Sequence, residues 1–229
     1  MVYVVTGANR GIGLKFVEQL AARGEVVYAT ARKPAEAEAL TALAAKHDGK
    51  VHVVALDVSD PESVAAFVAA LDGVTVDVLV NNAGIYPQSG GIGTLDLEAM
   101  RRGFEVNTIA PLRLTEVLLP SLRGSSVKKV MFLSSQMGSI ADNGSGGSYA
   151  YRMSKTALNM GVRSMSRDLA SDGFITFVVH PGWVQTDMGG PNAKITTEQS
   201  VAGMLAVLDS ADAQTSGEFM NWNGSKLEW

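Results

Sequence analysis

The chain has 229 residues, enough for one domain with a sizeable core, and a formal net charge of −4, which argues against a general nucleic-acid binder. It has no cysteine, which excludes disulfides, thiol nucleophiles and cysteine-ligated zinc, and its three histidines are too few for a histidine-rich metal site. The apolar runs are far shorter than the roughly 18–20 residues of a membrane-spanning helix, and no secretory signal pattern precedes the first strand-like run. We therefore expect a soluble, cytoplasmic protein with no metal site and no nucleic-acid or membrane partner.

Seven short runs rich in β-branched residues are expected to be strands. Most of them are almost continuously apolar, as in parallel strands that are covered on both faces. The expected strands are Val2–Thr6, Val26–Ala31, Val51–Leu56, Val76–Asn81, Val130–Ser134, Phe174–His180 and Glu218–Asn221.

Six stretches with helical periodicity lie between these runs. The expected helices are Ile12–Arg23, Ala35–His47, Pro61–Leu71, Leu97–Leu122, Tyr149–Ala170 and Glu198–Leu208. Ser59 with Glu62 has the spacing of a capping box, and so has Thr196 with Gln199. The alternation predicts an α/β Rossmann fold with a doubly wound, mostly parallel seven-stranded sheet and helices on both faces. Because no repeat, linker or composition break interrupts it, we expect a single domain over residues 1–229.

A glycine-rich turn joins the first expected strand to the first expected helix. Glycine lets the backbone turn tightly and approach a pyrophosphate, and the free N–H groups at a helix N-terminus bind the anion. In this strand–turn–helix context the turn predicts a dinucleotide site, whereas in another context it would be only a tight turn. The residues of the turn expected to contact the cofactor are Gly7, Asn9, Arg10, Gly11, Ile12 and Gly13.

Tyr151 and Lys155 are four residues apart and therefore share one face of a helix. The ordinary pKa of a tyrosine, about 10, is too high for easy proton transfer near neutral pH. A neighbouring ammonium group favours the phenolate and lowers that pKa. The pair predicts an acid–base catalyst. Taken alone it is also compatible with an ordinary surface pair, but the glycine-rich turn favours the catalytic interpretation.

Further motifs follow the turn in a fixed order along the chain. They are Asn81-Asn82-Ala83-Gly84 after the fourth strand, Asn107 inside the long helix, Ser134-Ser135 at the end of the fifth strand, Tyr151-Arg152-Met153-Ser154-Lys155, and Pro181-Gly182 with Thr186. With Thr6-Gly7-x-x-x-Gly11-x-Gly13, this set resembles the short-chain dehydrogenase/reductase superfamily over nearly the whole chain. Segment 138–143, the Tyr-Arg-x-Ser-Lys motif and Trp-Asn-Gly near the C-terminus look most like the Sniffer-like and C-factor-like carbonyl reductases within it.

The resemblance implies a catalytic role for four residues. Tyr151 would donate the proton, and Lys155 would bind the nicotinamide ribose and lower the pKa of Tyr151. Ser135 would orient the substrate carbonyl, with Ser139 as a weaker alternative. Asn107 would hold a water that links Lys155 to solvent; alternatively, it bonds its own helix at a kink near Pro111.

The resemblance also implies cofactor contacts beyond the glycine-rich turn. Asp57 would accept a hydrogen bond from the adenine amino group, although it could instead cap the helix that follows. The implied residues are Asp57 and Val58 at the adenine, Asn81, Ala83 and Gly84 along the adenosine, Tyr151 and Lys155, and Pro181, Gly182, Val184 and Thr186 at the nicotinamide.

The residue that ends the second strand decides between NAD and NADP, because an acid there bonds the ribose 2′-hydroxyl and repels a 2′-phosphate. Ala31 occupies this position and Arg32 follows it, while Arg10 lies in the glycine-rich turn. Two guanidinium groups suit a phosphate, so we expect NADPH/NADP⁺ as the cofactor.

These inferences predict an NADPH-dependent carbonyl reductase that transfers hydride to a ketone or aldehyde. Two alternatives stay open: a regulatory protein of the same fold that binds NADP(H) with little turnover, and an alcohol dehydrogenase that works oxidatively. The fifth expected helix is apolar on two sides, one of them around Met153 and Met160, which favours a homodimer.

Segment 187–195 is too short for a helical lid, and its two glycines predict a flexible cover. We therefore expect an open cleft for bulky or aromatic carbonyl compounds. Tyr86, Trp183 and Met188 are expected at its rim.

Overall fold

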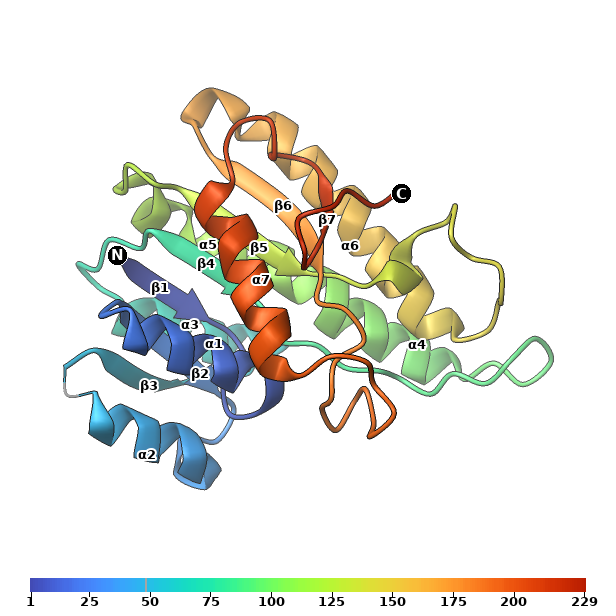
Figure 1. The fold of residues 1–229 in the computed structure, drawn as a ribbon, viewed down its shortest axis with the longest axis horizontal. Helices are drawn as coiled ribbons and strands as arrows, with labels where there is room; N and C mark the ends of the chain where they lie inside the picture. The colour runs from blue at the N-terminus through green and yellow to red at the C-terminus, as the bar shows by residue number, and fades with distance from the viewer. Residues whose placement is uncertain (48) are drawn as a thin grey trace.

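The computed structural model describes residues 1–47 and 49–229, which form one seven-stranded sheet flanked by helices (Figure 1). The strand order is β3-β2-β1-β4-β5-β6-β7, and every pairing is parallel. This confirms the predicted doubly wound sheet. The strands are β1 (Val2–Val5), β2 (Val26–Ala31), β3 (Val51–Ala55), β4 (Val78–Asn81), β5 (Lys129–Leu133), β6 (Ile175–His180) and β7 (Phe219–Asn221).

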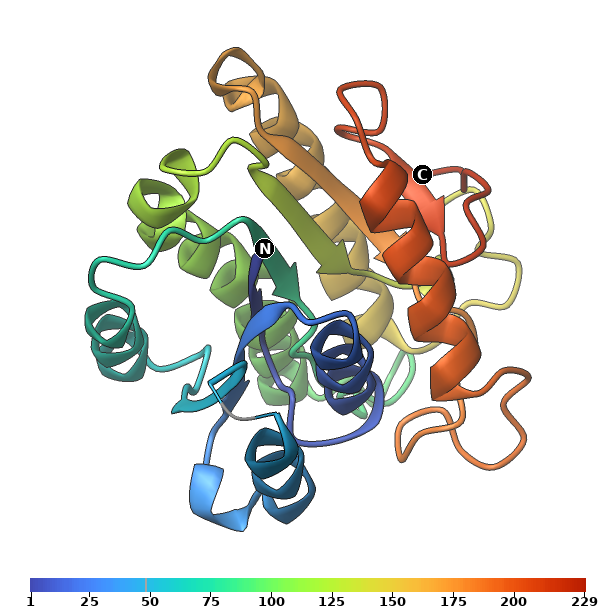
Figure 2. The same ribbon diagram turned by 60° about the vertical axis from the view of Figure 1, so that its left-hand side comes forward.

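Helices cover both faces of the sheet, as Figure 2 shows. Successive strand residues point to opposite faces. Val5 therefore packs with the helix residues Phe16 and Met204, while its neighbour Val4 packs with Phe67 and Leu118 on the other face. The helices are α1 (Gly11–Ala22), α2 (Glu38–Lys46), α3 (Pro61–Ala70), α4 (Leu97–Phe104), α5 (Ala110–Arg123), α6 (Tyr149–Asp168) and α7 (Thr197–Ser210).

The long helix expected over Leu97–Leu122 is wrong as a continuous α-helix. The π-helical segment Glu105–Ile109 separates α4 from α5. Pro111 lacks the N–H that would bond the carbonyl of residue 107 in an α-helix, which favours a wider turn at this point. The expected helix Ala35–His47 is also divided, because Ala37 has non-helical dihedral angles between a short 3₁₀ turn and α2.

One of the two expected capping boxes is confirmed and the other is wrong. The Thr196 hydroxyl accepts from the N–H of Gln199, and the Gln199 side-chain oxygen accepts from the N–H of Thr196. At α3 the cap is Asp60 and not Ser59, because the Ser59 hydroxyl donates to the Asp57 carboxylate at 2.6 Å.

The strand order reverses beside β1, where the chain passes from β3 back across β1 to β4. In open α/β sheets, ligands bind outside the carboxyl ends of the strands at such a switch point. Most of the residues that the sequence singled out lie in loops at this edge. Within the described residues, no helix has the length and apolar character to cross a membrane.

Candidate active site

The glycine-rich turn between β1 and α1 has a backbone shape that requires glycine. Gly7 and Gly11 have φ angles of +63° and +53°, in the left-handed region that glycine tolerates best. A Cβ atom on Gly13 would lie 2.3 Å from the carbonyl oxygen of Gly7. No side chain caps the N-terminus of α1 in the part of the chain that the structure describes. The turn therefore presents helix N–H groups that no side chain caps, beside a surface where a Cβ atom would not fit.

Thr6 and Asn82 brace this turn, a role that was not predicted for either residue. The Asn82 side chain donates to the carbonyl oxygens of Thr6, at 2.7 Å, and Gly7, at 3.1 Å. The Thr6 hydroxyl accepts from the backbone N–H groups of Asn82 and Ala83 at 3.0 and 2.9 Å. The position of Asn82 in the Asn-Asn-Ala-Gly motif is the sequence feature from which its role could have been predicted. These bonds fix the turn to the loop after β4.

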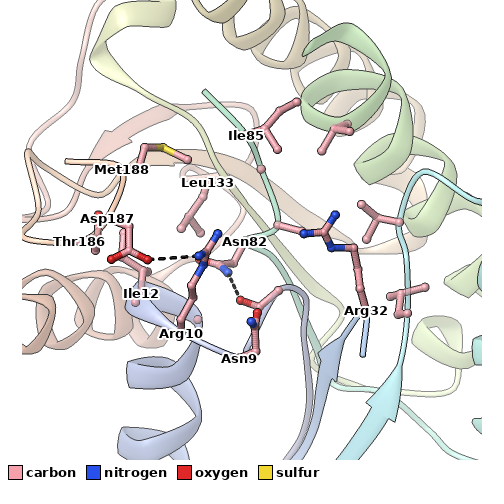
Figure 3. Close-up of a pocket in the computed structure, with 18 of the residues that line it drawn as sticks. Asn9, Arg10, Ile12, Arg32, Asn82, Ile85, Leu133, Thr186, Asp187 and Met188 are labelled. Atoms are coloured by element: carbon pink, nitrogen blue, oxygen red, sulfur yellow. Dashed lines mark hydrogen bonds and ion pairs between the residues drawn. The ribbon is translucent and has the colours of Figure 1, made fainter. Parts of the chain in front are cut away.

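A cavity of about 900 Å³ opens beside the turn (Figure 3). Most residues expected at the cofactor line it, from the glycine-rich turn to the end of β6. They are Gly7, Asn9, Arg10, Gly11, Ile12, Gly13, Arg32, Asp57, Val58, Ala83, Gly84, Tyr151, Lys155, Pro181 and Thr186.

Asn81, expected along the adenosine, does not line this cavity. Its side chain is buried against α5, where it donates to the Thr115 hydroxyl at 3.2 Å. Asn81 is the last residue of β4, and its side chain points into the sheet–helix layer instead of out of the strand end. Gly182 and Val184 lie on a second, adjoining cavity.

The two arginines expected at a 2′-phosphate both line the cavity. In Figure 3 they lie on either side of Asn9, with Arg32 at the end of β2. Arg10 is paired with Asp187 at 3.2 Å, and both side chains of the pair are largely exposed. Lys33 lines the same edge, and neither Lys33 nor Asp187 was anticipated from the sequence.

Asp57 follows β3 and forms a local turn. Its carboxylate accepts from both the N–H and the hydroxyl of Ser59. These bonds, together with the charge of Arg32, lower the pKa of Asp57 below its ordinary value, so the group is an anion and an acceptor. It does not cap α3, which removes that alternative.

Tyr151 and Lys155 are both buried on α6. Burial raises the pKa of Tyr151 to about 12, while a hydrogen bond with Ser135 acts in the opposite direction. Burial lowers the pKa of Lys155 to about 8, and its ammonium group donates to the carbonyl of Leu133 at 2.7 Å. The expectation that Lys155 lowers the pKa of Tyr151 is therefore not met in this structure, because desolvation outweighs the other effects.

Ser135 begins the loop after β5 and shares the second cavity with Tyr151. Its hydroxyl accepts from the N–H of Met137 at 3.1 Å, and it lies close enough to Tyr151 to lower the pKa of the phenol. The Ser134 hydroxyl is committed to another partner, because it donates to Asn159 at 2.6 Å. Ser139 accepts from the N–H of Asp142 and lines neither cavity. The geometry favours Ser135 over both neighbours.

Asn107 lies in the π-helical segment and bonds the loop after β4, not its own helix. Its side chain accepts from the N–H of Ile85 and donates to the carbonyl of Ile85, both at 2.9 Å. It also donates to the Ser154 hydroxyl at 3.0 Å, which in turn donates to the carbonyl of Tyr151. A Cβ atom on Gly84 would touch both Asn107 and Lys155. Asn107 therefore lies immediately behind the Tyr151–Lys155 pair.

The second cavity, about 550 Å³, adjoins the first one. Tyr86, Trp183 and Met188, the side chains expected at the rim, all line it, and each is substantially exposed. The Tyr86 ring lies 4.6 Å from the Tyr151 ring, centre to centre. The two cavities share residues at their junction, which are Ile12, Ser134, Tyr151, Pro181, Thr186 and Met188.

The segment after β6 is held by hydrogen bonds along its length. Trp183 donates from its indole to the carbonyl of Gly189 at 2.7 Å, and residues 194 and 195 donate to the carbonyl of Trp183. A Cβ atom on Gly189 would lie 2.0 Å from the carbonyl oxygen of Val184, and Gly190 has a φ of +75°. Close approach explains Gly189 and backbone conformation explains Gly190, whereas flexibility was the expected reason for both glycines.

A nicotinamide dinucleotide fits the chemistry of the first cavity. The absence of a side chain at Gly13 leaves room for a pyrophosphate, and the uncapped N-terminus of α1 suits its negative charge. Arg10 and Arg32 line the cavity where a further phosphate would be bound. Across the described residues, no three His, Asp or Glu side chains are grouped to hold a metal ion.

Comparison with known proteins supports the same assignment. The family model described as short chain dehydrogenase matches residues 1–196. The chain belongs to this family. C-signal of Myxococcus xanthus is 50% identical to this short-chain dehydrogenase over 154 residues, which are 67% of this chain and 93% of C-signal.

Two solved carbonyl reductases have nearly the same fold. The NADPH-bound carbonyl reductase from chicken fatty liver superposes with a TM-score of 0.94 at 40% identity, covering 100% of this chain and 98% of the other. The carbonyl reductase Sniffer of D. melanogaster has a TM-score of 0.93 at 32% identity, with the same coverage. Both the superfamily and its Sniffer-like branch are thereby confirmed.

Proposed function

We propose that this short-chain dehydrogenase is an NADPH-dependent carbonyl reductase that converts a ketone or aldehyde to the alcohol. The observation that carries the proposal is the position of Tyr151, buried and protonated at the junction of the two cavities, with Ser135 beside it. Its likeness to the NADPH-bound chicken reductase supports the choice of cofactor.

The first cavity binds the cofactor, which supplies the hydride. The backbone of Gly11 to Gly13 receives the pyrophosphate, and the Asp57 carboxylate accepts from the adenine. Arg10 and Arg32 bind the 2′-phosphate, and no acid ends β2 to repel it. The side assigned to the nicotinamide is formed by Pro181, Gly182, Val184 and Thr186.

The second cavity binds the carbonyl compound. Ser135 hydrogen-bonds the carbonyl oxygen and directs it toward the Tyr151 hydroxyl. Tyr151 gives its proton to that oxygen as negative charge develops on it. Because burial raises the pKa of Tyr151 to about 12, the phenol carries the required proton at neutral pH.

Lys155 and Asn107 support the proton transfer from Tyr151. The Lys155 ammonium binds the nicotinamide ribose and favours the phenolate once the proton has left Tyr151. Asn107 fixes the loop after β4 through Ile85 and holds the water that links Lys155 to solvent.

The test is NADPH oxidation, followed by absorbance, with a panel of bulky, aromatic and small ketones and aldehydes. The proposal expects turnover that requires Tyr151, and higher kcat/KM with NADPH than with NADH. Tight NADPH binding without turnover of any carbonyl compound would support the regulatory alternative instead. Faster alcohol oxidation with NADP⁺ than carbonyl reduction with NADPH, at neutral pH, would support the oxidative one.

The protein also forms a homodimer in this proposal. Met153 and Met160 on α6 are 43% and 67% exposed, and Ile109 and Val117 add 48% and 37% exposed side chains. A helix that is apolar on its outer face is stabilised when a partner covers it. Sedimentation measures the outcome directly, and a monomer at micromolar concentration contradicts it.

A further inference from the structure

His180 is a partly buried titratable group in the second cavity that the proposed mechanism does not use. We propose that His180 donates a hydrogen bond from Nε2 to the substrate and so selects carbonyl compounds with a second, uncharged acceptor oxygen near the reacting carbonyl. This inference rests on the proposed function and specifies its substrate. From the sequence, His180 is expected only at the end of a strand, although Pro181-Gly182 follows it directly.

The fold places His180 beside the reacting groups. It is the last residue of β6, and β6 pairs in parallel with β5, which leads directly into Ser134 and Ser135. Carboxyl ends of adjacent parallel strands lie at the same edge of a sheet. His180 and Ser135 therefore line one cavity, together with Tyr151.

The two ring nitrogens of His180 have different surroundings. Nδ1 is fully buried and has no hydrogen-bond partner among the described residues. Nε2 has no partner there either, but it is not among the fully buried atoms, so it is the nitrogen that reaches the cavity. A buried N–H without an acceptor is rarer in proteins than an acceptor that lacks a donor. The neutral ring therefore carries its proton on Nε2 and presents a donor to the cavity.

The charges around the ring determine which acceptor it binds. Burial lowers the pKa of His180 to about 4, although the nearby Asp142 carboxylate acts in the opposite direction, so the ring is neutral at pH 7. Arg152 and Asp142 also line the cavity, and their opposite charges leave it without a strong preference for one sign. Arg152 donates to the carbonyls of Gly146 and Met137 and to Ser145, while Asp142 accepts from the Gln136 amide. Because the ring itself is neutral, its N–H offers an anion no charge attraction and suits a neutral acceptor oxygen.

The rest of the cavity suits an apolar substrate body. Tyr86, Trp183, Met137 and Met188 line it, and three of them are substantially exposed. The inferred substrate therefore has an aromatic or aliphatic body, a reducible carbonyl, and a neutral acceptor such as an ether or a second carbonyl oxygen.

The experiment compares two ketones that differ in one atom: methoxymethyl phenyl ketone, with an ether oxygen, and propyl phenyl ketone, with a methylene in its place. We measure kcat/KM for both with NADPH, in the wild type and in three variants. His180→Phe removes the donor, and His180→Gln keeps an N–H near the position of Nε2. His180→Asn is the matched control, because its amide reaches only the position of Nδ1.

The expected result is a preference for the ether ketone that falls about tenfold in His180→Phe and His180→Asn and is kept in His180→Gln. The intrinsic reactivities of the two ketones cancel when the ratio in a variant is divided by the ratio in the wild type. Equal effects on both ketones, or no effect of His180→Phe, would overturn the inference.

Calorimetric binding of both ketones to the NADP⁺ complex gives a second readout that needs no turnover. The same loss of preference is expected there. If neither ketone is reduced, the binding difference between the wild type and His180→Phe still decides the role of His180, while the panel of carbonyl compounds decides the proposed function.

Discussion

The two cavities are built by different means. The phosphate end of the cofactor cavity is shaped by backbone: Gly7 and Gly11 have positive φ angles, Gly13 lies at a close approach, and Thr6 braces the turn from behind. The substrate cavity is formed by side chains from loops after β4, β5 and β6, several of them large, apolar and exposed. A phosphate site made of backbone N–H groups binds any nucleotide of the right shape. A cavity lined by loop side chains determines substrate specificity through those individual side chains.

Tyr151 stands where the two cavities meet, and its replacement is expected to have the largest effect. Tyr151→Phe removes the proton donor but keeps the ring that packs against Tyr86. We expect kcat to fall by about 10²-fold or more, the usual scale for a positioned general acid, with NADPH affinity nearly unchanged. Steady-state kinetics and cofactor fluorescence titration measure the two quantities.

The matched control is Tyr149→Phe, on the same helix but outside both cavities. Its kcat should equal that of the wild type. Normal turnover in Tyr151→Phe would mean that the proton comes from another group, and the proposed mechanism would be wrong.

Arg32→Asp tests the adenosine end of the cofactor cavity. The substitution replaces a phosphate partner with a carboxylate that bonds a 2′-hydroxyl and repels a phosphate. We expect the ratio of kcat/KM with NADPH to that with NADH to fall by about 10²-fold and to reverse the preference. Arg167→Asp, an exposed change of the same charge on α6, should leave the ratio unaltered. A wild type that already prefers NADH would refute the argument from Arg10 and Arg32.

The pH dependence of protein stability tests whether His180 is buried and uncharged in the substrate cavity. The pKa of His180 is lowered from 6.5 to about 4 in the folded protein, so between these values the unfolded chain binds a proton that the folded protein does not. Stability is therefore lost as the pH falls from about 7 toward 4. From pH 7.5 to pH 5 the wild type should lose about 2 kcal/mol more than His180→Gln, on the scale of 1.36 kcal/mol per pKa unit. Denaturant unfolding at both pH values measures this, and parallel losses would show an unperturbed histidine.

The two cavities also differ in how well they can be predicted from the sequence. The shape of the glycine-rich turn depends on which residues lack a Cβ, so Gly7, Gly11 and Gly13 could be identified from their spacing alone. The π-helical turn at Asn107 could not, because helical periodicity does not distinguish one wide turn from a continuous helix. His180 and Asp187 were missed because their surroundings come from loops that meet only in the folded protein.

Gly13→Ala tests whether the close backbone approach in the glycine-rich turn shapes the phosphate site. The added Cβ would lie 2.3 Å from the Gly7 carbonyl oxygen and 2.6 Å from the Asn82 amide nitrogen, so the turn must shift. We expect about tenfold weaker NADPH binding, measured by fluorescence titration, since local overpacking costs about 1–3 kcal/mol. Gly144→Ala is the control, because a Cβ there meets nothing within 4 Å. Unchanged NADPH affinity in Gly13→Ala would show that the close approach does not shape the phosphate site.

The smallest effect is expected at the ion pair between Arg10 of the glycine-rich turn and Asp187 of the segment after β6. Both side chains are largely exposed, so the pair contributes less than about 1 kcal/mol to stability. Asp187 also places a negative charge on the wall of the phosphate cavity and competes for Arg10. Asp187→Asn should therefore leave the unfolding free energy nearly unchanged and yet tighten NADPH binding by about two- to threefold at low salt. The gain should shrink at high salt, because screening weakens interactions between exposed charges. Weaker NADPH binding in Asp187→Asn would show instead that the pair holds Arg10 in its binding position, and that the segment after β6 helps to build the cofactor cavity as well as the substrate cavity.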